Sequence, residues 1–367
     1  MDVPFFKYRD MFAMHANEYR AAIDSVVGRG AFILQTENET FERELEAYTG
    51  ARHAIGVANG TDAIIIALRA AGIGPGDEVV LPSHTYIATA AAVHFVGATP
   101  VLVECAADHL IDPDAADAAV GPKTTALMPV QLNGRTADMD RLQAIADKHG
   151  LVIVEDSAQG VGSRFKGRMA GTFGKAGTYS FYPAKTLGSL GDAGGIVTDD
   201  DAVYEMAWLL HDHGRNPDGK VISWGLNSRL DNLQAGILSV RLHHLQDEIN
   251  RRRAVASLYQ EGLGDLEELA LPPAPGVDAD HYDVYQNYEI EADRRDQLKD
   301  FLKEHGVGSI IQWGGTPVHH MTELGVKANL PYTDRLFERC LLLPMNSMLS
   351  DAEIAYVVER VRAFYRG

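Results

Sequence analysis

Short apolar runs alternate with helical patterns along the first two-thirds of the chain. Several of these runs are almost wholly apolar, as expected for strands that are covered on both faces. Between them lie helical patterns such as 61–72, which ends on a glycine, and 138–149, which places Leu142, Ile145 and Ala146 on one face. This alternation predicts an α/β fold with a mostly parallel sheet. The seven predicted strands are 53–58, 78–81, 101–104, 125–130, 152–155, 177–181 and 195–198.

The pattern changes after about residue 225. A long helical stretch at 230–263 exceeds the usual length of one helix and predicts a link between two domains. A proline-rich loop at 271–276 follows it. The remainder predicts a smaller α+β domain with weak strands at 285–290 and 308–312 and helices at 293–305 and 351–365. We therefore expect a large domain at 1–245 and a small C-terminal domain at 246–367.

Length and composition are compatible with this organisation. The chain has 367 residues, enough for one large and one smaller domain, and its hydrophobic fraction of 46% is ordinary for a globular protein. No apolar run reaches the roughly 18 residues that a membrane span needs. The first ten residues lack the basic start and the apolar segment of a signal peptide, so we expect a cytoplasmic protein without a membrane partner.

Charge and cysteine content narrow the classes of partner. The net charge of −18 argues against a nucleic-acid binder, because phosphates repel an acidic surface. The basic run Arg251-Arg252-Arg253 predicts a solvated helix face, with phosphate binding in a groove between subunits as the alternative. The only cysteines, Cys105 and Cys340, are expected to be buried small hydrophobic residues rather than a disulfide. No Cys/His pair has zinc-ligand spacing, so we expect no structural metal.

Lys185 is the residue with the most specific chemistry. It follows the apolar run that ends at Phe181 and precedes a glycine-rich stretch at 188–195. A lysine on a turn beside a buried strand is desolvated, which lowers its pKa and makes it a nucleophile toward carbonyls. Asp156 stands at the carboxyl end of another predicted strand. This pair predicts an aldehyde cofactor that Lys185 carries as an imine and whose ring nitrogen Asp156 keeps protonated.

Other polar and aromatic residues follow the predicted strands. Gly60, Thr61 and Asp62 open a helix, whose free amides bind phosphate well, although Thr61 or Asn59 could simply cap the helix. Ser180 is a second possible phosphate donor, with a structural role as the alternative.

Two further residues complete the set of candidates. Tyr86 could stack on a flat heterocycle or pack in the core, and Gln159 could donate to the cofactor or lie on the surface. A phosphate anchor, an aromatic face, a carboxylate, donors and an amine are the five things that pyridoxal phosphate needs.

These residues carry a resemblance to a known family. The chain resembles the sugar aminotransferases of the DegT/DnrJ/EryC1/StrS family, within the fold type I pyridoxal-phosphate enzymes, over about residues 5–365. The stretches that carry the resemblance are 60–63, 155–159, 180–185, 191–195 and 225–235. The resemblance implies a large domain with a mostly parallel seven-stranded sheet flanked by helices, and a smaller α+β C-terminal domain.

The resemblance also implies roles for individual residues. Lys185 would bond to pyridoxal 5'-phosphate as a Schiff base, with pyridoxamine 5'-phosphate as the intermediate form. Asp156 would pair with the ring nitrogen, Gln159 would lie near the ring hydroxyl and Tyr86 would stack on the ring. Asn227 would reach the phosphate of the neighbouring subunit's cofactor, which implies a homodimer with shared active sites. The phosphate would be held by Gly60, Thr61, the Asp62 amide and Ser180.

Three places depart from the usual family pattern. Thr186 stands where an asparagine often follows the lysine, and 131–134 lacks the usual histidine and aromatic residue. The segment 312–320, which contains Trp313, His319 and His320, also differs from the usual aromatic-proline version. The segment 131–134 lines the sugar side of the site in relatives, and no role is assigned to Trp313, His319 or His320.

The resemblance implies an aminotransferase that moves an amino group from L-glutamate to a keto or aldehyde sugar. The stretch 225–231 resembles members that act on 3-keto nucleotide sugars, so a 3-keto substrate is favoured over a 4-keto one. Such a product would serve a surface polysaccharide or a glycosylated metabolite. A nucleotide-free keto or aldehyde sugar acid and a non-catalytic regulator of the same fold are the alternatives. A sugar dehydratase is disfavoured, because those members carry histidine where this chain has Lys185.

Overall fold

The computed structural model, which describes residues 1–366, contains the predicted seven-stranded sheet. Its strand order is β1-β9-β8-β5-β4-β2-β3, in which β9 runs antiparallel to both neighbours and the other pairs are parallel. All seven strands overlap the predicted ones, which confirms the α/β fold class with a mostly parallel sheet. The strands are β1 (His53–Val57), β2 (Glu78–Pro82), β3 (Thr99–Val103), β4 (Thr124–Leu127), β5 (Val152–Asp156), β8 (Ala176–Ser180) and β9 (Gly194–Thr198).

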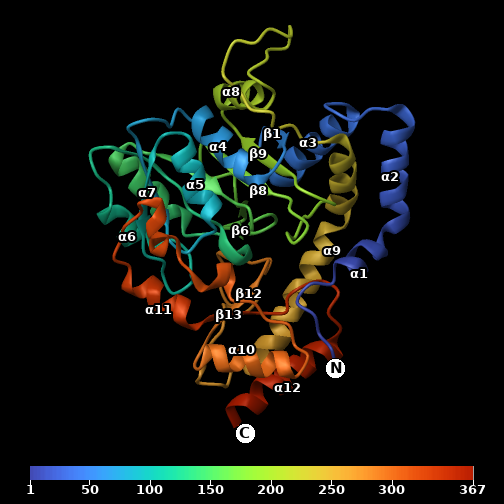
Figure 1. The fold of residues 1–367 in the computed structure, drawn as a ribbon, viewed down its shortest axis with the longest axis vertical. Coiled ribbons are helices and arrows are strands. Elements are labelled where there is room, and N and C mark those ends of the chain that lie inside the picture. Colours follow the sequence, from blue (N-terminus) through green and yellow to red (C-terminus); the bar gives the residue numbers. More distant parts are fainter. Residues whose placement is uncertain (367) are drawn as a thin grey trace.

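Helices cover both faces of this sheet, which explains why its strands are apolar throughout. Successive strand residues enter different cores: Val79 packs with α4 and α5, whereas Val80 packs with α7. Figure 1 shows α4 and α5 in front of the sheet, and α6 and α7 beside it. The helices of this part are α1 (Tyr8–Met14), α2 (Ala16–Arg29), α3 (Thr36–Thr49), α4 (Gly60–Ala70), α5 (Ile87–Phe95), α6 (Pro113–Ala118), α7 (Met139–His149) and α8 (Asp201–His211).

The long helix α9 (Asn232–Leu263) runs from the large sheet to a second, smaller sheet, as Figure 1 shows. That sheet is antiparallel and consists of β10 (Leu269–Ala270), β12 (Tyr288–Ala292) and β13 (Cys340–Leu343). It packs against helices α10 (Arg295–Glu304) and α12 (Asp351–Arg366) through an apolar core of its own. The remaining elements are α11 (Pro331–Arg339), a minor sheet of β6 (Arg164–Phe165), β7 (Arg168–Met169) and β11 (His281–Tyr282), and short 3-10 turns at Leu132–Gly134, Gln312–Gly315, Val318–His320 and Thr322–Leu324.

The strand predicted at 308–312 is wrong. Ile310 makes a single bridge to Leu342, and the chain then enters the 3-10 turn at Gln312–Gly315. Directly after the predicted strand, Trp313 has a φ of 48° and Gly314 a φ of 69°, and this left-handed backbone prevents the single bridge from extending into a strand.

The predicted domain boundary at residue 245 falls inside α9, which is one continuous helix. The first residues belong to the predicted large domain, but they contact the part of the chain that contains the smaller sheet. Val3 forms a bridge with Val307 and is buried in the apolar core of that sheet. The division into 1–245 and 246–367 therefore stays a prediction. Within residues 1–366, no helix is both long and apolar enough to cross a membrane.

Two predictions about side chains had different outcomes. Cys105 and Cys340 are buried free thiols, as expected. The solvated face predicted for Arg251-Arg252-Arg253 is wrong, because Arg252 is only 2% exposed and Arg253 donates to the Asp283 carbonyl. All three arginines therefore donate to backbone carbonyls in the C-terminal part of the chain.

Candidate active site

A cavity of about 510 Å³ lies where β2, β5 and β8 end and α4 and α5 begin. The carboxyl ends of parallel strands meet at one edge of a sheet, which is where α/β proteins bind ligands. Most of the candidate residues from separate parts of the sequence line this one cavity. They are Gly60, Thr61, Tyr86, Asp156, Gln159, Ser180 and Lys185.

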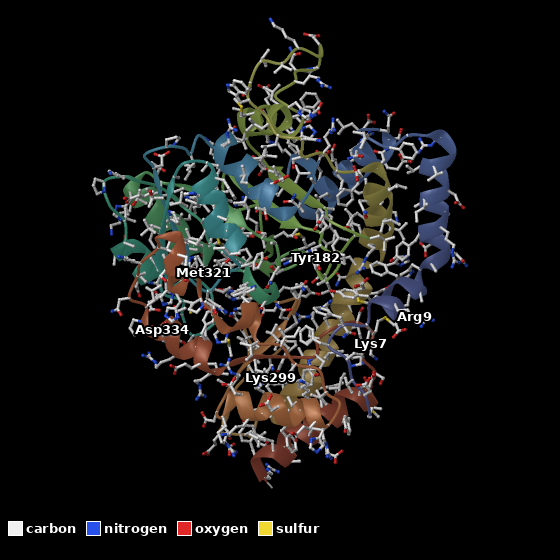
Figure 2. The ribbon with its side chains drawn as sticks, in the orientation of Figure 1. Lys7, Arg9, Tyr182, Lys299, Met321 and Asp334 are labelled. Carbon is white, nitrogen blue, oxygen red and sulfur yellow. The ribbon has the colours of Figure 1, made fainter. Side chains whose placement is uncertain are left out.

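Lys185 lies on the turn that follows β8. Its backbone amide donates to the Tyr182 carbonyl at 2.8 Å, and Figure 2 shows Tyr182 near the middle of the molecule. Burial lowers the pKa of the Lys185 amine to about 8, although the nearby charge of Asp156 acts in the opposite direction. A substantial fraction of the amine is therefore neutral near pH 8 and is able to attack a carbonyl carbon.

Asp156 ends β5 and is 4% exposed. Its Oδ2 accepts a hydrogen bond from the Thr89 hydroxyl at 2.7 Å, and its Oδ1 accepts from the Ala158 amide at 3.1 Å. Burial raises the pKa of the carboxyl, whereas these two donors and the charge of Lys185 lower it. A buried carboxylate of this kind is stabilised further by a cationic N–H group that enters from the cavity.

Thr89 was missed by the sequence reasoning. It lies in α5 among alanines, and its hydroxyl also bonds to that of Thr85 at 2.7 Å. Both threonines line the cavity, one helical turn apart. The sequence offered one signal for them, which is the spacing of four residues between Thr85 and Thr89.

The start of α4 forms the predicted phosphate-binding end of the cavity. Gly60 and Thr61 are its first helical residues, whose amides have no partner within the helix. The Asp62 amide instead donates to the side chain of Asn59 at 2.8 Å, and Asp62 does not line the cavity. The structure thus places the Asp62 amide in the helix cap that Asn59 provides.

Gly60 permits a close approach between α4 and β8. A Cβ atom at Gly60 would lie 2.7 Å from the Cβ atom of Ser180. The hydroxyl of Ser180 therefore lies directly beside the helix start, so the two groups predicted to bind phosphate share one corner of the cavity.

Tyr86 and Gln159 line other parts of the same cavity. Tyr86 immediately precedes α5 and its side chain is 57% exposed, so its ring is accessible to a ligand. Gln159 accepts hydrogen bonds through Oε1 from the Asn133 amide at 2.8 Å and from the Asn287 side chain at 3.4 Å. Its Nε2 group thus remains as a donor for a ligand oxygen.

Asn227 does not line this cavity. It lies in a neighbouring hollow, together with Arg229, that shares Asn59 and Asp192 with the first cavity. Its side chain is therefore beside the site of its own chain without belonging to it.

Trp313 lines the cavity, whereas His319 and His320 do not. The Nε2 atoms of both histidines lie within 2.9 Å of one carboxylate oxygen of Asp334. His319 also contacts the Ser83 hydroxyl through Nδ1 at 2.7 Å. These contacts give the two histidines structural partners.

The residues that line the cavity match the groups of pyridoxal phosphate. The volume lies within the range of about 300–1,000 Å³ that is typical of small-molecule sites. Lys185 offers an amine to the aldehyde, Asp156 a buried carboxylate to the ring nitrogen, and the start of α4 offers amides to the phosphate. By this test the cofactor fits the residues present.

Comparisons with known proteins agree with this chemistry. The sequence model of the DegT/DnrJ/EryC1/StrS aminotransferase family matches residues 14–362. A pleiotropic regulatory protein of Geobacillus stearothermophilus is 40% identical over 100% of this chain and 99% of its own. A dTDP-3-amino-3,4,6-trideoxy-alpha-D-glucose transaminase of Streptomyces venezuelae is 40% identical over 98% and 95%. A UDP-N-acetyl-3-dehydro-alpha-D-glucosamine 3-aminotransferase of Acidithiobacillus ferrooxidans is 38% identical over 100% and 98%.

Solved structures show the same architecture. DesV of S. venezuelae, in complex with a ketimine intermediate, has a TM-score of 0.96 at 39% identity and covers 100% of this chain and 99% of its own. NtdA of Bacillus subtilis, with the bound cofactor PMP, has a TM-score of 0.92 at 29% identity over 100% and 86%. The family match, the fold and the cavity together show that this chain belongs to the pyridoxal-phosphate-dependent DegT/DnrJ/EryC1/StrS aminotransferase family.

Proposed function

We propose that this protein transfers an amino group from L-glutamate to a keto sugar carried on a nucleotide, with C3 as the carbon that receives it. The observation that carries the proposal is the presence of Lys185 and Asp156 in one buried cavity, each influencing the other's pKa. An amine of lowered pKa and a buried carboxylate are the two groups that an aminotransferase needs around its cofactor.

The residues of the cavity have distinct tasks in this reaction. Pyridoxal phosphate, when bound, supplies an aldehyde and an electron-withdrawing ring that accepts the charge left by a departing proton. Lys185 would hold the cofactor through its amine, and the same amine, when free, would take the proton from the donor's Cα as a general base. Asp156 keeps the ring nitrogen protonated, and the donors Thr89 and the Ala158 amide hold its carboxylate in place.

The remaining residues bind and orient. Gly60, Thr61 and Ser180, which lie where α4 meets β8, would hold the phosphate, and Tyr86 would stack on the ring. Gln159 donates from its Nε2 group to the ring hydroxyl, because Asn133 and Asn287 hold its oxygen. These residues would orient the cofactor relative to the Lys185 amine.

The choice of acceptor is supported by the relatives. Two of them are named for sugar substrates or products with the amino or keto group at position 3, one carried on dTDP and the other on UDP. The stretch 225–231 of this chain favours the same position. The amino sugar would then enter a surface polysaccharide or a glycosylated metabolite.

We propose a homodimer in which Asn227 of each chain completes the cofactor site of the other. Asn227 lies beside its own cavity but outside it, which is the arrangement expected of a residue that serves a second copy. The loop between α8 and Asn227 projects from the molecule in Figure 1. It exposes Val221, Ile222 and Trp224 by 61%, 56% and 89%. Exposed apolar side chains of this size are typical of an interface.

A regulatory role is the alternative that one comparison favours, because one relative is named as a pleiotropic regulatory protein. A regulator that had lost catalysis would not need both Lys185 and Asp156, and this chain has both. A nucleotide-free sugar acid as acceptor is the other alternative, and the following assay separates it.

The assay charges the purified protein into its pyridoxamine form with L-glutamate and then supplies acceptors. Return of the pyridoxal-form spectrum with a 3-keto nucleotide sugar, and ping-pong kinetics, are expected. A response only to 4-keto nucleotide sugars or to free keto sugar acids would contradict the proposed acceptor. A protein that never converts between the two forms would contradict the transferase role.

A further inference from the structure

One buried amide side chain binds both neighbours of Lys185. Gln286, which is 6% exposed, lies between β11 and β12. Its Oε1 accepts hydrogen bonds from the Thr186 amide at 2.5 Å and the Thr186 hydroxyl at 2.7 Å. Its Nε2 donates to the Ala184 carbonyl at 2.8 Å. Three hydrogen bonds from a distant segment therefore fix the backbone on either side of the lysine.

The segment that carries Gln286 has an unusual backbone. Tyr285 has a φ of 50°, a left-handed conformation that bulky residues rarely adopt. A Cβ atom at Gly134 would lie 2.6 Å from the Gln286 nitrogen and 2.8 Å from the Tyr285 nitrogen, so only glycine permits this close packing. Backbone strain of this kind persists only where the surroundings impose it, and it often accompanies a functional task.

Two buried arginines of α9 hold the same region. Arg252, 2% exposed, donates through Nη1 to the carbonyls of Tyr285, Gln286 and Met345 at 3.1, 3.2 and 3.3 Å. Arg241, 1% exposed, donates through Nη2 to the Thr186 carbonyl at 3.2 Å and to Glu248. The backbone carbonyls of Gln286 and Thr186 are thus both bound by arginines of one helix, α9.

We propose that Gln286 and Thr186 are a positioning pair that holds the Lys185 amine inside the cavity, facing Asp156. The reactivity of Lys185 then depends on the docking of the segment that precedes β12 against the turn that follows β8. The catalytic consequence of the pair rests on the proposed function, whereas its effect on the amine itself does not.

The three hydrogen bonds of Gln286 keep the Lys185 amine away from water. Each backbone residue has two soft dihedral angles, and the three hydrogen bonds of Gln286 restrain those of residues 184 and 186. Without them the turn relaxes and the flexible lysine side chain reaches water, where its charged form is favoured again. The carboxylate of Asp156, the charged group that faces Lys185, would then be farther from the amine.

The test measures Lys185 in the cofactor-free chain, with Gln286→Leu and Thr186→Val as variants. Competitive acetylation across the pH range, read peptide by peptide with mass spectrometry, reports the pH at which each lysine becomes reactive. Lys303, an exposed lysine of α10, provides the labelling reference. Thr198→Val is the matched control, because Thr198 is a buried threonine that donates to the Lys175 carbonyl at the opposite edge of the sheet.

In the wild type, Lys185 is expected to titrate near pH 8. Gln286→Leu should raise this midpoint by about one unit, a roughly tenfold loss of neutral amine near pH 7. Thr186→Val should raise it by a smaller amount, Thr186→Ser should restore it, and Thr198→Val should leave it unchanged. In the loaded enzyme, Gln286→Leu should lower kcat about tenfold with little change in the KM of the donor.

An unchanged Lys185 midpoint in folded Gln286→Leu and Thr186→Val chains would overturn the proposal, as would an equal shift in Thr198→Val. If Gln286→Leu fails to fold, the Lys185 midpoints of Thr186→Val and Thr186→Ser test the proposal by themselves. The labelling needs neither cofactor nor substrate. A protein that lacks transaminase activity would therefore refute the proposed function without touching this result.

Discussion

At the scale of single residues, the state of Asp156 depends on one hydroxyl. Burial raises the pKa of this carboxyl, and the hydrogen bond from Thr89 is the largest of the effects that lower it. Thr89 is itself oriented by Thr85, since the two hydroxyls lie 2.7 Å apart. Thr89 thus opposes the effect of burial on the pKa of Asp156 and fixes the orientation of its carboxyl group.

Replacing Thr89 by valine preserves the shape of the side chain and removes this donor. A hydrogen bond to a charged group contributes about 1.5–3 kcal/mol, so we expect kcat to fall by about 10- to 100-fold. The pKa of Asp156 should rise further, which moves the acidic limb of the pH–rate profile to higher pH. Steady-state kinetics across pH measure both effects.

Thr89→Ser retains the hydroxyl and should restore most of the activity. A Thr89→Val enzyme with the kcat and the acidic limb of the wild type would show that Asp156 does not need this donor. Because Thr198 lies at the opposite edge of the sheet, Thr198→Val again controls for the loss of a buried hydroxyl.

Residue-scale features were the hardest to predict from the sequence. Lys185 and Asp156 could be recognised because each follows a strand-like run, and the structure brings both into one cavity. Arg252 could not, because a charged residue in a helical pattern predicts solvent exposure, and its three carbonyl partners come from segments far along the chain. The role of Gln286 is invisible for the same reason.

At the scale of elements, the contact between α4 and β8 shapes the end of the cavity that we propose for the phosphate. Gly60→Ala would place a Cβ atom 2.7 Å from that of Ser180 and push the helix start away from the strand. We expect about a tenfold weaker affinity for pyridoxal phosphate, since the helix amides would move out of position. Equilibrium titration of the cofactor-free protein measures this affinity.

The matched control is Gly28→Ala in α2, where an added Cβ atom meets nothing within 4 Å. It should raise stability by up to about 1 kcal/mol, through helix propensity, and leave cofactor affinity unchanged. If Gly60→Ala and the wild type bind pyridoxal phosphate with equal affinity, the close contact of α4 and β8 is not needed for cofactor binding.

A buried ion pair joins β12 to the loop that follows β3. Glu289, 2% exposed, accepts hydrogen bonds from His109 at 2.8 Å and from the Asn133 side chain at 2.8 Å. Burial alone would lower the pKa of His109, but Glu289 and Glu291 raise it to about 10. Burial alone would raise the pKa of Glu289, but His84 and His109 hold it far below its usual range.

Glu289→Gln should destabilise the protein by about 3 kcal/mol at neutral pH, because it removes the closer of the two carboxylates that pair with the buried His109 and leaves only Glu291, at 3.4 Å. Because the pKa of His109 is raised in the folded state, protonated His109 contributes its full stabilisation of the protein below about pH 6.5. This contribution is lost as the pH rises through about 10. The difference between variant and wild type should therefore shrink above pH 9. Urea unfolding at several pH values measures it, and a difference that is small at pH 7 would contradict the ion pair.

Element-scale prediction succeeded where burial on both faces made a strand continuously apolar, as in β5 and β8. It failed at 308–312, where the left-handed Trp313 ends any strand and only Ile310 pairs. The short strand β13 was not predicted, because its four residues follow α11 directly, without a turn residue between them.

At the scale of the whole molecule, the proposed sharing of sites makes each cavity depend on two chains. A Lys185→Ala chain retains Asn227, and an Asn227→Ala chain retains Lys185. A heterodimer of the two would contain one complete site and one site that lacks both residues. An equal mixture, after exchange of subunits, should regain about a quarter of the wild-type activity, because half of the dimers are mixed.

Each variant alone should have much lower activity than the mixture. A mixture that exchanges subunits, as shown by native mass spectrometry, yet regains no activity would contradict the shared site. The architecture that this prediction uses was predictable only in part: the sequence places Asn227 before the long helix, whereas its separation from its own cavity emerges only in three dimensions.

The proposed chemistry is tested most directly by trapping the covalent bond between Lys185 and the cofactor. The protein is incubated with pyridoxal phosphate, reduced with borohydride, digested and examined by mass spectrometry. We predict an absorbance band at about 400 nm before reduction and a reduced cofactor adduct on Lys185 afterwards. Neither should form in a Lys185→Ala chain. A wild-type protein without the band, or with the adduct on another lysine, would contradict the assignment of Lys185 on which the proposed chemistry depends.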